Sequence, residues 1–138
     1  MKVIIAGSRT CTDYSLLEEA IRESGFEITT VLCGGAKGAD ILGKQWAINN
    51  MEISIDSFPV NSIDWQIHGS YAGNLRNIEM AREADALIAL WDGKSTGTKH
   101  MIETMKLYEK LIYVKPVPIS IKNTIKEHKN HPKTGFFT

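Results

Sequence analysis

Short apolar runs alternate with longer amphipathic segments along most of the chain. The runs are rich in β-branched residues and too short for stable helices, so they predict strands, most of them buried on both faces. The predicted strands are Val3–Ala6, Ile28–Cys33, Ile53–Phe58, Ala86–Trp91 and Leu111–Val114, with a further short candidate at Val117–Ile121. The run Ile53–Phe58 alternates apolar and polar residues, which favours a position near a sheet edge.

Between these strands, apolar residues recur at helical spacing. The predicted helices are Asp13–Gly25, Gly38–Asn50, Asn74–Ala84 and Thr98–Lys110. Asp13 or Ser15 is the predicted N-cap of the first helix, and Gly25 is its predicted end. The side chains predicted to face the core include Ile41, Leu42, Trp46, Leu75, Ile78 and Tyr108.

Strands that alternate with helices indicate βαβ units, a parallel sheet and right-handed crossovers. We therefore predict a Rossmann-like three-layer α/β/α sandwich, with a mostly parallel sheet of five or more strands. Residues 1–121 form the predicted domain. Residues 122–138 form a basic polar tail, for which the sequence predicts no structure.

The composition fits one globular domain, since 43% of the 138 residues are hydrophobic and 23% are charged. Sixteen basic and sixteen acidic residues cancel, which excludes a uniformly basic nucleic-acid coat or a polybasic membrane binder. From Lys115 onward the chain carries five lysines and one glutamate, so the tail is basic and the preceding body mildly acidic. The sequence shows no apolar run of membrane-spanning length and no signal peptide, and two cysteines are too few for a disulfide framework. We expect a soluble cytoplasmic protein that does not bind membranes.

Three glycine-containing loops follow predicted strands: Gly7–Thr10, Gly34–Asp40 and Asp92–Thr98. The carboxyl ends of parallel strands share one edge of the sheet, where ligands of such folds bind. Glycine allows backbone N–H groups to approach an anion, and a helix N-terminus favours negative charge. Each loop alone is also compatible with simple turn geometry, and none is a G-x-G-x-x-G or Walker A motif. Together they predict a site for a small phosphate-bearing ligand.

Charged residues beside these loops supply candidate contacts. Arg9 and Arg76 can clamp a phosphate, although each is also compatible with an ordinary surface arginine. Asp40 can accept hydrogen bonds from a ribose or hold the glycine loop in place, and Trp65 or Trp91 can flank a base. The predicted ligand-binding residues are Gly7, Ser8, Arg9, Gly34, Gly35, Gly38, Asp40, Arg76, Asn77, Gly93, Ser95, Gly97 and Thr98.

Catalytic and metal chemistry has weaker support. The hydroxyl-bearing residues of the loops lack an obvious His/Asp partnership for nucleophilic catalysis. His100, His128 and His131 show no metal-ligand spacing with the two cysteines, so we expect neither a metal nor a cofactor. Arg76, Asp40 and Glu103 are the candidate catalytic residues, and Glu103 is also compatible with a solvated surface carboxylate.

Four motifs in order resemble the YspA/YpsA-related branch of the SLOG superfamily. They are Gly7-Ser8-Arg9, Cys33–Asp40, Gly73–Asn77 and Asp92–Thr98. The resemblance covers about residues 2–114 and implies a Rossmann-type nucleotide-binding domain. The superfamily includes Lonely Guy phosphoribohydrolases, DNA-processing protein A, and sensor domains for signals such as ADP-ribose derivatives. The resemblance also implies a homo-oligomer. It further implies an origin in a phage or mobile element, because small members of the branch occur in such genomes.

The chain departs from the phosphoribohydrolases at one position. Those enzymes place a catalytic glutamate three residues after the threonine that corresponds to Thr98, and this chain has Met101 there. Three functions remain: a sensor or sequestering protein for a nucleotide-derived ligand, an enzyme that cleaves N-glycosidic bonds, and a single-stranded DNA binder. We favour the first, because the missing glutamate opposes the second and the neutral charge opposes the third.

Overall fold

The computed structural model describes the chain except residues 35–37, 60–65, 68, 70, 119–134 and 138. Its six-stranded sheet has the order β3-β2-β1-β4-β5-β6. The first five strands are parallel, and β6 pairs antiparallel with β5. The strands are β1 Lys2–Gly7, β2 Thr30–Cys33, β3 Ser54–Ser57, β4 Ala86–Trp91, β5 Leu111–Pro116 and β6 Gly135–Phe137. The five predicted strands are confirmed, as is the edge position of the third.

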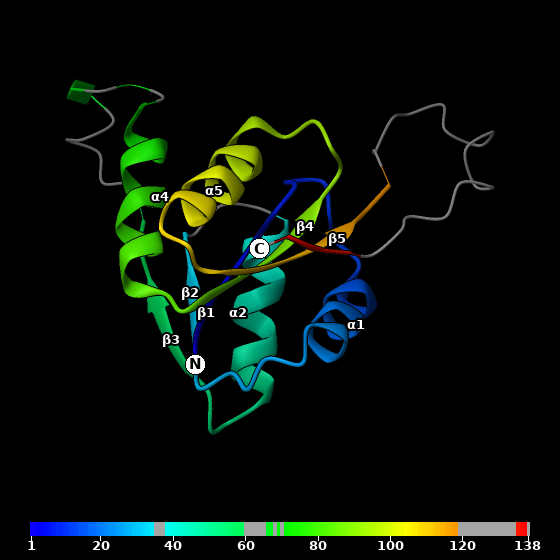
Figure 1. Ribbon diagram of the computed structural model, residues 1–138. Helices are drawn as coiled ribbons and strands as arrows, with labels where there is room; N and C mark the ends of the chain where they lie inside the picture. Colours follow the sequence, from blue (N-terminus) through cyan, green and yellow to red (C-terminus); the bar gives the residue numbers. More distant parts are fainter. Residues whose placement is uncertain (35–37, 60–65, 68, 70, 119–134, 138) are drawn as a thin grey trace.

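Helices cover both faces of this sheet (Figure 1). They are α1 Tyr14–Ser24, α2 Ala39–Asn49, α4 Tyr71–Glu83 and α5 Thr96–Leu107. Successive strand residues point to opposite faces: Val3 and Ile5 join the core beneath α1 and α2, whereas Ile4 joins the core beneath α4 and α5. The Rossmann-like three-layer sandwich is therefore confirmed.

The ends of α1 follow the sequence signals. Asp13 is the N-cap, and its Oδ1 accepts a hydrogen bond from the Ser15 N–H at 3.0 Å. Gly25 ends the helix with a φ of 69°, a left-handed conformation that glycine adopts without steric cost.

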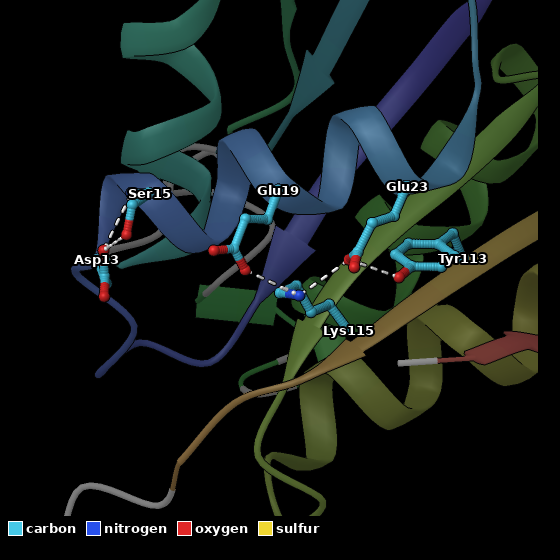
Figure 2. Close-up of polar contacts among 6 residues, drawn as sticks. All are labelled: Asp13, Ser15, Glu19, Glu23, Tyr113 and Lys115. Atoms are coloured by element: carbon cyan, nitrogen blue, oxygen red, sulfur yellow. Dashed lines mark hydrogen bonds and ion pairs between the residues drawn. The ribbon is translucent and has the colours of Figure 1, made fainter. Parts of the chain in front are cut away.

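A buried lysine fastens α1 to β5. The Lys115 side chain is 7% exposed, and its Nζ lies 2.9 Å from Glu23 Oε1 and 3.2 Å from Glu19 Oε2 (Figure 2). Tyr113 also donates a hydrogen bond to Glu23, at 2.8 Å. Burial lowers the pKa of Lys115, but hydrogen bonds to Glu23 and Glu19 outweigh burial and leave that pKa raised. The hydrogen bonds from Lys115 and Tyr113 lower the pKa of Glu23, so this pair is ionised at neutral pH.

Four predicted inward positions were wrong. Ile41 and Tyr108 are 48% and 39% exposed, and Leu75 and Ile78 are only half-buried and belong to neither core cluster. In α4 the buried residues include Met80 and Ala81, which belong to the core beneath α4 and α5. The buried face of α4 also carries the polar Asn77, so the apolar residues Leu75 and Ile78 gave a misleading helix phase.

The C-terminal region also departs from expectation. Of the candidate strand at 117–121, residues 117 and 118 are not in a strand, and the rest lie outside the described residues. Instead, β6 comes from the segment for which the sequence predicts no structure, and it pairs with Ile112–Val114.

Candidate functional site

A cavity of about 650 Å³ opens where the carboxyl ends of β1 and β4 meet the N-terminal halves of α4 and α5. It is lined by Ala6, Gly7, Arg9, Thr10, Asp40, Gly73, Asn74, Arg76, Asn77, Met80, Asp92, Ser95, Thr96, Gly97, Thr98, His100 and Met101. β1 is followed by α1 on one face of the sheet and β4 is followed by α5 on the other face, so the cavity lies at the switch point of the sheet. Ligands of open α/β sheets bind at this position.

The N-terminus of α5 forms one wall. Its N-cap, Ser95, makes no side-chain capping bond, and the Lys99 N–H is bonded to the Ser95 carbonyl at 3.1 Å. The N–H groups of the first turn have no partner within a helix, and they carry the positive end of its dipole. Since Thr96, Gly97 and Thr98 line the cavity, this positive end faces into it.

Ser8 is buried beneath the loops and forms hydrogen bonds with several of them. It is 1% exposed, and its Oγ accepts hydrogen bonds from the Asp92 N–H at 3.1 Å and from Ser95 Oγ at 3.2 Å. Its carbonyl accepts from the N–H groups of Cys11 and Ala39, the first residue of α2. Ser8 does not line the cavity, so its observed contacts join three segments that do.

Asp92 shapes the loop before α5. Its Oδ1 accepts hydrogen bonds from the N–H groups of Lys94 and Ser95, both at 2.8 Å. Burial raises the pKa of Asp92, but the bonds from Ser95, Lys94 and Ser8 outweigh burial and leave that pKa lowered. The carboxylate is therefore ionised at neutral pH, and it accepts hydrogen bonds from the backbone of its own loop.

Arg76 reaches from α4 to the end of β2. Its Nη1 donates to the Gly34 carbonyl at 3.1 Å, while its buried Nε has no hydrogen-bond partner among the described residues. An ideal Cβ on Gly34 would lie 2.7 Å from Arg76 Cζ. Glycine at position 34 therefore leaves the space that the Arg76 guanidinium needs to contact the backbone there.

Asn77, 5% exposed, ties α4 to α5. Its Nδ2 donates to the Gly97 carbonyl at 3.2 Å and lies 3.1 Å from His100 Nδ1. Arg76 and Asn77 are both predicted ligand-binding residues, and both line the cavity.

The remaining predicted site residues differ in whether they line the cavity. Asp40 is 7% exposed and lines the cavity from the first turn of α2. Glu103 does not line it, since its side chain is 59% exposed and lies 3.9 Å from Lys99 on the outer side of α5. Gly38 and Gly93 shape the loops without lining the cavity, and Gly35 lies outside the described residues.

Sequence reasoning missed several lining residues. In the sequence, His100 is considered only as a metal ligand, and Met80 and Met101 fall on apolar positions of predicted helices. All three line the cavity, the two methionines together with Ala6. Their periodicity fits both core and cavity, so it gave no separate signal. Trp91 is not on the lining, and its indole N–H donates to the Ser95 carbonyl at 3.1 Å. Trp65 lies outside the described residues.

Two further observations concern the described part of the chain. Both cysteines, Cys11 and Cys33, are free and buried, and burial raises the pKa of the Cys11 thiol. None of the helices there is long and apolar enough to cross a membrane.

Comparison with known proteins agrees with this architecture. The structure is similar to the X-ray structure of DNA processing protein A from Streptococcus pneumoniae, with a TM-score of 0.66 and 18% identity. The match covers 91% of this chain but 53% of that protein, so this chain spans about half its length and the likeness is one of fold.

Sequence comparison is more specific. The chain is 37% identical to the gene 61 protein of Mycobacterium phage D29 over 105 residues, which cover 72% of this chain and 83% of that protein. A family model described as "YspA, cpYpsA-related SLOG family" matches residues 1–68, which contain β1 through β3 and the first two glycine loops. The chain therefore belongs to the YspA, cpYpsA-related SLOG family.

Proposed function

We propose that this protein binds a nucleotide or nucleotide-derived signalling ligand in the cavity and acts as a sensor or sequestering protein. The observation that carries the proposal is the wall of that cavity, where the N-terminus of α5 faces the same space as Arg9 and Arg76. These groups offer positive charge and N–H donors to a phosphate. A volume of about 650 Å³ lies within the usual range for small-ligand sites.

The rest of the wall suits the other parts of a nucleotide. Asp40 offers a carboxylate that can accept hydrogen bonds from ribose hydroxyls. Met80 and Met101 offer an apolar, polarisable surface on which a base can lie.

Binding without cleavage is favoured by position 101. Met101 is 1% exposed, lines the cavity, and stands where the phosphoribohydrolases that this chain resembles place a catalytic glutamate. A thioether cannot transfer a proton, and Glu103 lies outside the cavity.

The proposal is tested by a thermal-shift panel followed by mass spectrometry of each ligand. The panel contains AMP, ADP-ribose, cyclic ADP-ribose isomers, cyclic dinucleotides and short oligodeoxynucleotides. A ligand at a hundredfold excess over Kd stabilises the folded state by about 2.7 kcal/mol. A stabilising nucleotide recovered intact supports a sensor or sequestering role, and recovery as free base would support the glycosidase instead. Stabilisation by oligodeoxynucleotides alone would support nucleic-acid binding.

The expected homo-oligomer is a separate proposal, carried by the resemblance. Sedimentation velocity with and without the stabilising nucleotide tests it. A mass near 15.4 kDa in both conditions would overturn it.

A further inference from the structure

The amide of Asn77 determines which nitrogen of His100 carries a proton. Asn77 Nδ2 lies 3.2 Å from the Gly97 carbonyl oxygen and 3.1 Å from His100 Nδ1. A carbonyl oxygen can only accept a hydrogen bond, so it fixes the Asn77 amide with its NH₂ group towards Gly97 and His100. The reversed amide would place two oxygens against each other.

The second N–H of Asn77 then requires an acceptor at His100 Nδ1. A ring nitrogen accepts only when it carries no proton, so the proton of the neutral imidazole is on Nε2. Because Asn77 is 5% exposed and bonded on both sides, it has little freedom to change this arrangement.

We infer that His100 is a ligand-binding residue of the cavity, which donates a hydrogen bond from Nε2–H to an oxygen of a phosphate. This inference rests on the proposed function. His100 is half-buried and lines the cavity one turn into α5, and Nε2 is its remaining ring nitrogen. The residue extends the row of donors that begins with the first-turn N–H groups of the helix. It is a directional donor, whereas Arg9 and Arg76 supply charge.

The same geometry removes one catalytic role from His100. A base must accept a proton through a free lone pair, and in this tautomer the lone pair on Nδ1 is engaged by Asn77. His100 therefore binds the ligand without activating water.

The first test is the tautomer of His100 in the ligand-free protein at pH 8, where an ordinary imidazole is neutral. The ¹⁵N shifts of the two ring nitrogens and their couplings to ring protons identify the protonated nitrogen. The expected result is a proton on Nε2, with loss of this preference in Asn77→Ala. A proton on Nδ1 in the wild type would overturn the inference, whatever the ligand proves to be.

The second test is a pair of variants that separate a ligand contact from a structural one. In His100→Gln the side-chain amide nitrogen can reach the place of Nε2, so the donor to the ligand is kept and the contact with Asn77 is lost. In His100→Asn the shorter side chain can keep an acceptor for Asn77 and loses the donor to the ligand. Calorimetric titration with AMP and ADP-ribose measures Kd for each variant, and circular dichroism checks the fold.

The expected result is that His100→Asn weakens binding about ten- to hundredfold, while His100→Gln stays within a few-fold of wild type. The reverse order would overturn the inference and leave the proposed function standing. Failure of the wild-type protein to bind either nucleotide or any other member of the panel would remove the proposed function and the inference together, while the tautomer of the free protein would still be measured.

Discussion

Gly38 carries a backbone conformation that other residues rarely adopt, at the point where the second glycine loop enters α2. Its φ is 76°, and an ideal Cβ there would lie 2.4 Å from the Ser8 carbonyl oxygen. We predict that Gly38→Ala lowers the free energy of unfolding by about 2–4 kcal/mol, because both the dihedral and the clash with backbone are costly. Urea denaturation measures the change.

Gly93→Ala is the matched control. Gly93 has a similar φ of 82°, but no atom of the described residues lies within 4 Å of its ideal Cβ. It should therefore cost only the dihedral term of about 1–2 kcal/mol. Equal losses in the two variants would contradict the close approach of Gly38 to Ser8.

Asp92 should make stability depend on acid pH. Its pKa is lowered in the folded state, so the stability it provides is present above the unfolded pKa of about 3.9 and is lost as pH falls through the lower folded value. Asp92→Asn should lose about 1–2 kcal/mol at pH 7, since bonds from Lys94 and Ser95 to a charged acceptor become bonds to a neutral one. Urea denaturation of ligand-free protein from pH 7 to pH 2.5 should show this difference shrinking below about pH 4. A difference that is constant across this range would contradict the role assigned to the charge.

Arg76 should matter more for binding than for folding. We predict that Arg76→Ala weakens AMP binding about ten- to hundredfold, because a charged donor is lost from the cavity wall, while the fold is retained. Gly34→Ala should produce a similar loss, since the new Cβ displaces the flexible guanidinium.

Arg82→Ala is the control for charge on the same helix. Arg82 is exposed, does not line the cavity, and donates from Nε to Tyr108 Oη at 3.4 Å. Calorimetric titration should give this variant the affinity of wild type. Equal losses for Arg76→Ala and Arg82→Ala would indicate a general charge effect and contradict a specific contact.

At the scale of the secondary-structure element, the N-terminus of α5 is the part of a helix that the proposed site uses. Gly97 is exposed at its first turn, and in the part of the chain that the structure describes no atom lies within 4 Å of its ideal Cβ. Gly97→Asp should keep or raise the melting temperature, because a carboxylate near a helix N-terminus is favourable by about 0.3–1 kcal/mol. The same carboxylate should repel a phosphate and weaken AMP binding at least tenfold.

Lys99→Gln is the matched control for α5, because it changes the net charge equally and lies two residues away, outside the cavity lining. It disturbs only an exposed pair with Glu103 and should bind AMP like the wild type. If Gly97→Asp bound AMP with unchanged affinity, the N-terminus of α5 would not be part of the site.

The same elements show what the sequence could predict. Val3–Ala6 and Ala86–Trp91 are continuous apolar runs, which are typical of buried parallel strands. The sequence therefore predicts both the sheet and the edge at which the loops gather. The strand β6 has three residues and pairs antiparallel across a long separation in sequence, so no local periodicity indicates it. In α4 the buried positions are Ala72, Asn77, Met80 and Ala81, so the polar Asn77 lies on the buried face while the apolar Leu75 and Ile78 stay half-buried, which a hydrophobic pattern does not predict.

At the scale of the whole molecule, the site depends on contacts between helices and loops as well as on the glycine loops themselves. Parallel topology brings Gly7, Asp40 and Gly97 to one edge, and this much is readable from the sequence. The contacts that unite α4 with α5 and Ser8 with the loop of Asp92 join residues 20 or more apart in sequence. They depend on side-chain geometry that only the folded chain defines, and His100 therefore gains a role only in the structure.

The central claim is that a nucleotide occupies the cavity at the switch point of the sheet. The most direct measurement is a titration of ¹⁵N-labelled protein with AMP and ADP-ribose, followed by the chemical shifts of its backbone amides. We predict that the largest changes fall on residues 73–77 and 95–100, with little change along the exposed face of α2. Saturable changes confined to other surfaces, or no change at millimolar nucleotide, would contradict the account.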